Sequence, residues 1–144
     1  MTTAATEQTR QVVARFVEAH ERGDAAAISG FLTQDVTWHL PPSAGVGPFT
    51  GPDQVSAALA GGAAGNWLDT ATIRRTVTRI VADGDTAVAL ESKTATTHSG
   101  EHYANDYCWV FTVRDGLVAT VRNYTDTLLA DRVFGLDNKT PTRP

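Results

Sequence analysis

Three short turn sequences divide the second half of the chain into four runs of strand-like composition. Each turn contains glycine beside a polar residue, and the runs between them are rich in threonine, valine and aromatic residues. The turns are DGD (83–85), SGE (99–101) and RDG (114–116), and the expected strands cover 70–82, 86–97, 102–113 and 117–125. Because turns this short join antiparallel neighbours, these residues predict a four-stranded meander.

The first half of the chain has mainly helical patterns. Apolar residues recur at helical spacing over residues 7–22, and Gly23 ends that pattern. Asp24 is a cap for a second helix over 25–32, and Pro52 suits the first position of a third helix. The remaining elements are a strand at 36–40 ended by Pro41 and Pro42, and a short helix at 126–134 for which Asp126 is the cap.

This order of elements predicts an α+β fold. Helices that precede a meander favour helices packed on one face of a curved antiparallel sheet. Such a sheet wraps round the first helix and leaves a cone whose mouth suits a small molecule. We expect a single domain over residues 1–144, with an ordered core at about 7–134 and a tail at 135–144.

Composition argues against several classes of protein. The net charge of −4 is unlike the basic excess of nucleic-acid binders, and Arg74, Arg75 and Arg79 are expected to be a solvated strand face. No apolar run approaches the roughly 20 residues of a membrane span, and the N-terminus lacks the pattern of a signal peptide. We therefore expect a cytoplasmic protein that binds neither nucleic acid nor membrane.

Neither the single cysteine nor the histidines predict a metal site. Cys108 excludes an internal disulfide and is expected to be a small buried hydrophobe. His20, His98 and His102 are scattered without ligand spacing. No cofactor is expected.

Several segments together resemble the nuclear transport factor 2-like superfamily, and more narrowly its SnoaL-like and ketosteroid-isomerase-like branch. The resemblance covers roughly residues 7–134. It rests on VVARFVEAHERGDAAAISGFL (12–32), DVTWHLPP (35–42), FTG (49–51) and NDYCWVFTVRDGLVATVRNYTDT (105–127). It implies a cone-shaped α+β barrel, a pocket on the concave face of the sheet, and a homodimer formed through the convex face.

The same resemblance assigns the strand faces. In NDYCWVF (105–111) alternate residues share a face. The inward set would be Asn105, Tyr107, Trp109 and Phe111, joined by Trp38, Leu40, Asn123 and Thr125 from other strands. Asp106, Cys108, Val110 and His39 would face outward. A β-bulge would reverse this and bring His39 and Asp106 inside as an acid/base pair.

The catalytic groups of the best-known relatives are absent at the positions to which the resemblance carries them. The tyrosine, the base and the second acid of ketosteroid isomerases fall on Phe16, Leu40 and Trp109, and the acid/base aspartate of SnoaL-like cyclases also falls on Trp109. The polar set of limonene epoxide hydrolases falls on Ser92, Thr94 and Asn123. What remains is a neutral pocket, with no group that titrates near neutrality.

The expected function is a cofactor-independent enzyme that cyclises or isomerises a hydrophobic polyketide- or terpenoid-like substrate. Asn105, Tyr107 and Asn123 are the candidate catalytic residues, and Phe16, Trp38, Leu40, Trp109 and Thr125 are the candidate substrate-binding residues. The alternatives are a hydrophobic-ligand-binding protein without activity, or an epoxide hydrolase or dehydratase with a rearranged polar set.

Overall fold

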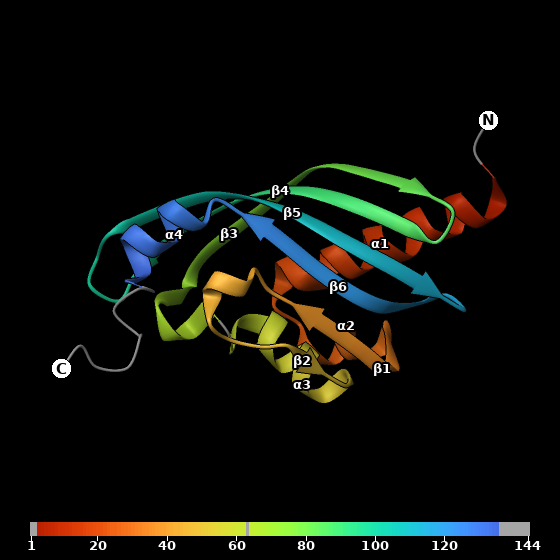
Figure 1. Ribbon diagram of the computed structural model, residues 1–144, viewed down its shortest axis with the longest axis horizontal. Helices are drawn as coiled ribbons and strands as arrows, with labels where there is room; N and C mark the ends of the chain where they lie inside the picture. The colour runs from red at the N-terminus through yellow and green to blue at the C-terminus, as the bar shows by residue number, and fades with distance from the viewer. Residues whose placement is uncertain (1–2, 63, 136–144) are drawn as a thin grey trace.

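The computed structural model describes residues 3–62 and 64–135. Its main elements are one six-stranded sheet and four α-helices (Figure 1). The helices are α1 (Ala4–Arg22), α2 (Ala25–Gly30), α3 (Pro52–Ala57) and α4 (Thr127–Phe134). The strands are β1 (Leu32–His39), β2 (Phe49–Thr50), β3 (Leu68–Asp83), β4 (Thr86–Thr97), β5 (His102–Arg114) and β6 (Leu117–Thr125).

The predicted meander is confirmed, and its strand ends agree with the sequence within two residues. Strands β3 to β6 pair in chain order and antiparallel, within a sheet of order β2-β1-β6-β5-β4-β3. The first strand differs from expectation because β1 lies parallel to β6, so the sheet is mixed rather than wholly antiparallel. Parallel neighbours need a long crossover, and α3 with most of the meander supplies it.

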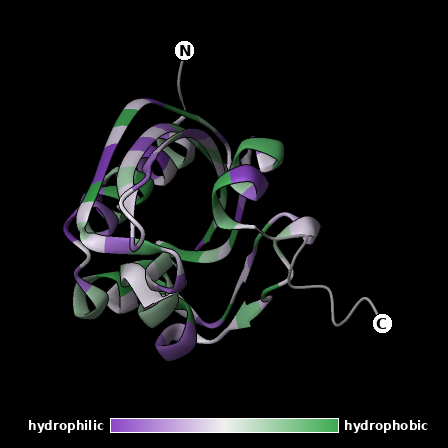
Figure 2. Ribbon diagram, turned by 90° about the vertical axis from the view of Figure 1, so that its left-hand side faces the viewer, coloured by the Kyte–Doolittle hydropathy of each residue, from purple (hydrophilic) through white to green (hydrophobic). Residues whose placement is uncertain are grey.

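The sheet curls strongly and does not close into a barrel (Figure 2). Register shifts between Asp69 and Arg74, and between Val77 and Arg79, bend β3 at two points. Helix α1 packs on the inner face of the sheet, where the Phe16 ring meets the Phe111 ring edge-on at 5.2 Å between centroids. The curled sheet therefore encloses the first helix, as the α+β prediction required.

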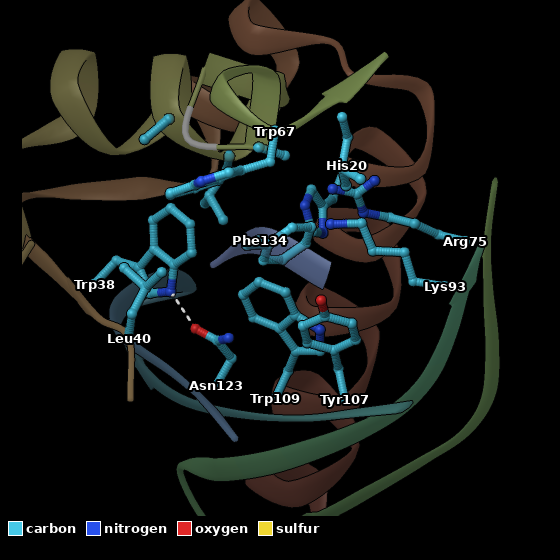
Figure 3. A pocket seen from close by; sticks show the side chains of 14 residues that line it. His20, Trp38, Leu40, Trp67, Arg75, Lys93, Tyr107, Trp109, Asn123 and Phe134 are labelled. Carbon is cyan, nitrogen blue, oxygen red and sulfur yellow. Dashed lines mark hydrogen bonds between the residues drawn. The ribbon is translucent and has the colours of Figure 1, made fainter. Parts of the chain in front are cut away.

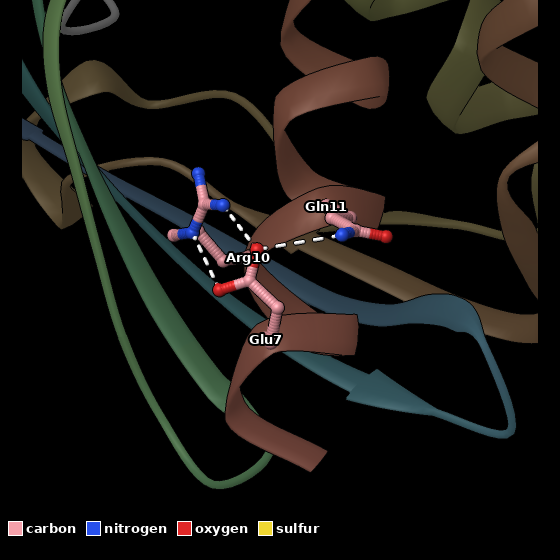
Figure 4. Close-up of polar contacts among 3 residues, drawn as sticks. All are labelled: Glu7, Arg10 and Gln11. Atoms are coloured by element: carbon pink, nitrogen blue, oxygen red, sulfur yellow. Dashed lines mark hydrogen bonds and ion pairs between the residues drawn. The ribbon is translucent and has the colours of Figure 1, made fainter. Parts of the chain in front are cut away.

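Helix α1 has one buried face and one solvated face. Val13, Phe16 and Val17 are buried at helical spacing, and the helix ends where Gly23 adopts a left-handed φ of 65°. On the opposite face Arg10 forms an ion pair with Glu7, and Gln11 donates to the same carboxylate (Figure 4). Exposed pairs of this kind contribute little to stability, so the buried face fixes the helix.

Both predicted aspartate caps are confirmed. Asp24 accepts from the backbone N–H of Ala27 at 3.0 Å, and Asp126 accepts from that of Leu129 at 3.0 Å. No helix in residues 3–62 or 64–135 is long and apolar enough to cross a membrane. Most of the expected tail, 136–144, lies outside the described residues.

Asp126→Ala should destabilise the protein by about 1 kcal/mol, because the first turn of α4 loses its cap. Urea unfolding measures this loss. Asp126→Asn is the matched control, since asparagine caps as well as aspartate, and it should stay near wild type. Equal losses in both variants would show that the cap is not the cause.

Candidate active site

The strand NDYCWVF presents its aromatic face to the interior. Asn105, Trp109 and Phe111 are buried, and the pairing of this segment with β4 has no bulge. Asp106 is exposed on the outer face, where its carboxylate accepts a hydrogen bond from Ser92 Oγ at 2.9 Å. The alternative in which a bulge brings Asp106 and His39 inside is therefore wrong.

A cavity of about 100 Å³ lies between the inner face of the sheet, the end of α1 and α4 (Figure 3). Its walls are mostly aromatic and aliphatic side chains. The lining residues include His20, Trp38, Leu40, Trp67, Arg75, Lys93, Tyr107, Trp109, Asn123 and Phe134. A second hollow of about 90 Å³ shares five of these residues and extends toward the loop after β1 and the start of α4.

Most of the candidates from the sequence meet in this place. Trp38, Leu40, Tyr107, Trp109 and Asn123 line the cavity. Thr125 lines only the second hollow and a groove on the outer face. Phe16 and Asn105 are buried nearby but do not line the cavity. The expected uncharged residues therefore meet in one cavity, except for Phe16, Asn105 and Thr125.

Asn105 is held by the structure rather than offered to a ligand. Its amide donates to Tyr103 Oη at 2.9 Å and to the Asp126 carbonyl at 3.0 Å, and its oxygen accepts from the Asp106 N–H at 2.8 Å. The Tyr103 and Tyr107 hydroxyls lie 2.6 Å apart. These bonds satisfy the buried amide, so Asn105 positions α4 and the tyrosines.

Asn123 is oriented by a buried hydrogen bond. Trp38 Nε1 donates to Asn123 Oδ1 at 2.8 Å, and the Trp38 ring also packs 5.9 Å from that of Trp109 between centroids. The bond uses the oxygen of the amide. No described residue accepts a hydrogen bond from Asn123 Nδ2, so its N–H groups are available in the cavity wall.

A group of four ionisable side chains in the interior was not expected from the sequence. Arg75 comes from β3, Glu91 and Lys93 from β4, and His20 from α1. His20, Glu91 and Lys93 are buried, and the side chain of Arg75 is only 8% exposed. The prediction of a solvated arginine face is therefore wrong for Arg75. The prediction of a pocket without titrating groups is wrong as well.

The pairing of β4 with β5 explains why these groups face inward. Glu91 stands opposite Tyr107 and Lys93 opposite Asn105, and residues opposite each other share a face of the sheet. Ser92 and Thr94, the positions to which the epoxide-hydrolase residues were carried, are exposed instead.

Arg75 and Glu91 form a buried ion pair. Arg75 Nε lies 3.8 Å from Glu91 Oε1, and the two side chains are 8% and 2% exposed. Burial raises the pKa of Glu91, while Arg75, Lys93 and the nearby Trp109 indole oppose this shift. Burial likewise lowers the pKa of Arg75, and Glu91 opposes that shift. Each group thus favours the charged form of the other against the cost of burial.

Lys93 is buried, and none of the described residues forms an ion pair with it. Burial, and next the charge of Arg75, lower its pKa from 10.5 to about 7. Its Nζ lies 5.3 Å from the centroid of the Tyr107 ring (Figure 3). Burial also holds the pKa of His20 well below its ordinary value, so that ring is neutral at pH 7. Lys93 is thus the cavity group that changes charge near neutrality.

The arrangement can perform proton transfer beside an apolar ligand. An amine that titrates near neutrality, a fixed positive charge and amide N–H donors all line this cavity. Within residues 3–62 and 64–135, no three histidine, cysteine, aspartate or glutamate side chains cluster so as to hold a metal ion.

The chain belongs to the SnoaL-like domain family, whose model matches residues 13–121. No curated protein matches the chain.

Solved structures with the same fold have varied roles. A nuclear transport factor 2-like protein of unknown function from Burkholderia pseudomallei K96243 is 21% identical, with a TM-score of 0.77 over 88% of this chain and 97% of that one. A protein from Jannaschia sp. CCS1 proposed to be a SnoaL-like polyketide cyclase is 18% identical, with a TM-score of 0.75 over 93% and 96%. A limonene-epoxide-hydrolase-like enzyme from Mycobacterium tuberculosis is 19% identical, with a TM-score of 0.69 over 90% of each chain. At these identities the likeness establishes the fold.

Lys93→Met should make stability less dependent on pH. Between pH 7 and 10.5 the unfolded chain binds a proton at Lys93 that the folded chain does not. Wild-type stability should therefore rise with pH there, by up to about 1.4 kcal/mol per unit from this group. The variant lacks this contribution. Its free energy of unfolding should therefore exceed that of wild type at pH 7, and the difference should disappear by pH 10.

Urea unfolding of both proteins at several pH values tests the prediction. Lys139→Met, which alters the chain's other lysine, should follow the wild-type curve. If the free energies of unfolding of Lys93→Met and wild type differ by the same amount at every pH, the pKa of Lys93 is not lowered.

Proposed function

We propose that this protein is a cofactor-independent enzyme that isomerises or cyclises a hydrophobic carbonyl compound of polyketide or terpenoid type, through its enol or enolate. The observation that carries the proposal is Lys93, a buried amine with a pKa of about 7 in the wall of an aromatic cavity. A general base acts best when its pKa lies near the working pH.

In this proposal the neutral Lys93 amine removes a proton from the carbon next to the carbonyl. Tyr107 is unsuited to that step, because burial raises the pKa of its hydroxyl far above neutrality. His20 is neutral but a weak base, because its pKa is low. Lys93 then carries the proton as an ammonium and can return it to another carbon, which would complete an isomerisation.

The developing oxyanion would be stabilised by groups that the fold already orients. The Asn123 Nδ2–H groups are fixed by the Trp38 bond to the other end of the amide. The guanidinium of Arg75 adds a positive charge in a poorly solvated wall. Donors fixed before the reaction need no reorganisation, which is why such groups lower barriers strongly.

The size of the cavity limits the substrate. Typical ligand pockets measure about 300–1,000 Å³, whereas the two adjoining hollows measure about 100 and 90 Å³. A substrate with one or two rings is therefore favoured over a tetracyclic one. The aromatic walls would hold its apolar body while the carbonyl faces Lys93 and Asn123.

Two alternatives use the same cavity. A binding protein without activity would use the aromatic walls alone. An epoxide hydrolase, as in the Mycobacterium tuberculosis relative, is less favoured because the one buried carboxylate of the described residues, Glu91, is paired with Arg75 and does not line the cavity.

Exchange of α-protons tests the proposal without knowledge of the natural substrate. Cyclohexenone or benzylacetone in deuterium oxide should gain deuterium next to the carbonyl, measured by proton NMR. The rate should rise with pH to a plateau above about 7, because the base must be neutral. Lys93→Met should lower it by roughly 10²–10⁴, and Asn123→Ala by about 10²–10³.

Lys139→Met is the matched control and should exchange at the wild-type rate. Ligand binding detected by tryptophan fluorescence, without Lys93-dependent exchange, would overturn the enzyme proposal in favour of a binding protein. Hydrolysis of a cyclic terpene epoxide without exchange would favour the epoxide hydrolase.

We also propose that the chain forms a homodimer through the outer face of β4–β6. Leu90, Cys108 and Tyr124 pair in one row across these strands and line a groove there. Leu90 is 41% exposed and Tyr124 54% exposed. A contiguous apolar row of this kind is typical of an interface.

Leu90→Asp should convert the dimer to a monomer in sedimentation velocity at micromolar concentration, because it places a charge in the apolar row. Leu128→Asp alters a leucine on α4 that is 59% exposed, and it should leave the dimer intact. A wild-type protein that sediments as a monomer would refute the proposal.

A further inference from the structure

Lys93 has the surroundings of an amine nucleophile as well as those of a base. The residue is 8% exposed, yet its side chain lines the cavity (Figure 3). In residues 3–62 and 64–135, no carboxylate lies within ion-pair distance of its Nζ. The amine can therefore meet a carbonyl carbon held against the aromatic wall.

Burial and the positive charge of Arg75 favour the neutral form of Lys93, whereas the charge of Glu91 and the face of the Tyr107 ring favour the ammonium. Arg75 on β3 is a fixed positive charge, and its partner Glu91 on β4 is already paired with it. His20 on α1 is neutral, and Tyr107 on β5 offers the face of its ring. A lysine that is desolvated beside another cation is activated for attack on carbonyl compounds.

We propose that Lys93 is a covalent site that forms an imine with an aldehyde or ketone bound in the cavity. The Nζ lone pair forms a bond to the carbonyl carbon, and the carbonyl oxygen takes up a proton to give a carbinolamine. The carbon–oxygen bond then breaks as the carbon–nitrogen double bond forms. Both amine protons leave with that oxygen as water.

The imine would serve the same proton transfer more efficiently. Once protonated on nitrogen, it withdraws electrons from the adjacent carbon, whose proton is then lost more readily than from the parent ketone. The inference rests on the proposed function in one respect, because both require a carbonyl compound in the cavity. They differ in whether Lys93 becomes bonded to it.

The chain is well suited to a trapping experiment because it contains only two lysines, Lys93 and Lys139. At pH 7 an ordinary lysine is neutral in fewer than about one molecule in 10³, whereas a group with a pKa of about 7 is half neutral. Lys139 and the N-terminal amine therefore serve as internal references for reactivity.

The experiment incubates the full-length protein with benzylacetone and sodium cyanoborohydride at pH 7. The reductant converts an imine into a stable secondary amine, and peptide mapping by mass spectrometry locates it. Lys93 should carry the adduct at a rate about tenfold or more above that of Lys139, given its larger neutral fraction. Lys139→Arg should leave this adduct unchanged, and Lys93→Arg should abolish it.

The outcomes separate the inference from the proposed function. Modification of Lys93 no faster than of Lys139 or the N-terminal amine overturns the covalent site. If Lys93-dependent deuterium exchange persists in that case, the proposed function stands and Lys93 acts only as a base. An adduct on Lys93 without exchange supports the covalent site and refutes the proton-transfer function.

Discussion

The ion pair between Arg75 and Glu91 determines the chemistry of the cavity because it occupies the one buried carboxylate of the described residues. A buried amine with its own counter-ion would keep its charge. Lys93 stands beside a pair that is already neutral overall, and the charge of Arg75 lowers the pKa of Lys93 more than the charge of Glu91 raises it. The resulting preference for the neutral amine follows from burial and from this division of charges.

The fold places these groups where proton transfer can occur. The curl of the sheet turns the inner faces of β3, β4 and β5 toward the end of α1, so that charged and aromatic side chains meet in one small volume. The Trp38–Asn123 hydrogen bond fixes an amide that lines the same cavity. The relatives with this fold have different roles, so these side chains rather than the fold carry the functional argument.

The sequence predicted most of the fold because its signals are local. Short glycine turns specified the meander, and Asp24 and Asp126 specified helix starts. Alternation grouped Trp109 with Tyr107 and Phe111, and the family resemblance then placed that face inside. The parallel pairing of β1 with β6 could not be read from the sequence, because it joins segments about 80 residues apart through a crossover.

The charged half of the site was missed for two physical reasons. On β4 the inward residues are small alanines followed by Glu91 and Lys93, whereas the outward residues include Val88 and Leu90, so hydrophobicity favours the wrong face. On β3 the register shift between Val77 and Arg79 places Arg75 on the inner face, where it pairs with Lys93. The other two arginines of this strand, Arg74 and Arg79, pair with residues of the outer face. The position of the SGE turn pairs Lys93 with Asn105. Because Asn105 was expected to face inward, this pairing could have predicted that Lys93 faces inward too.

The most direct test of this account is an NMR titration of the Lys93 side chain. With carbon-13-labelled lysine the protein gives two Cε signals, one from Lys93 and one from Lys139. The account predicts that one signal titrates with a midpoint near pH 7 and disappears in Lys93→Met. Two signals that both titrate near the ordinary lysine value of about 10.4 would contradict it.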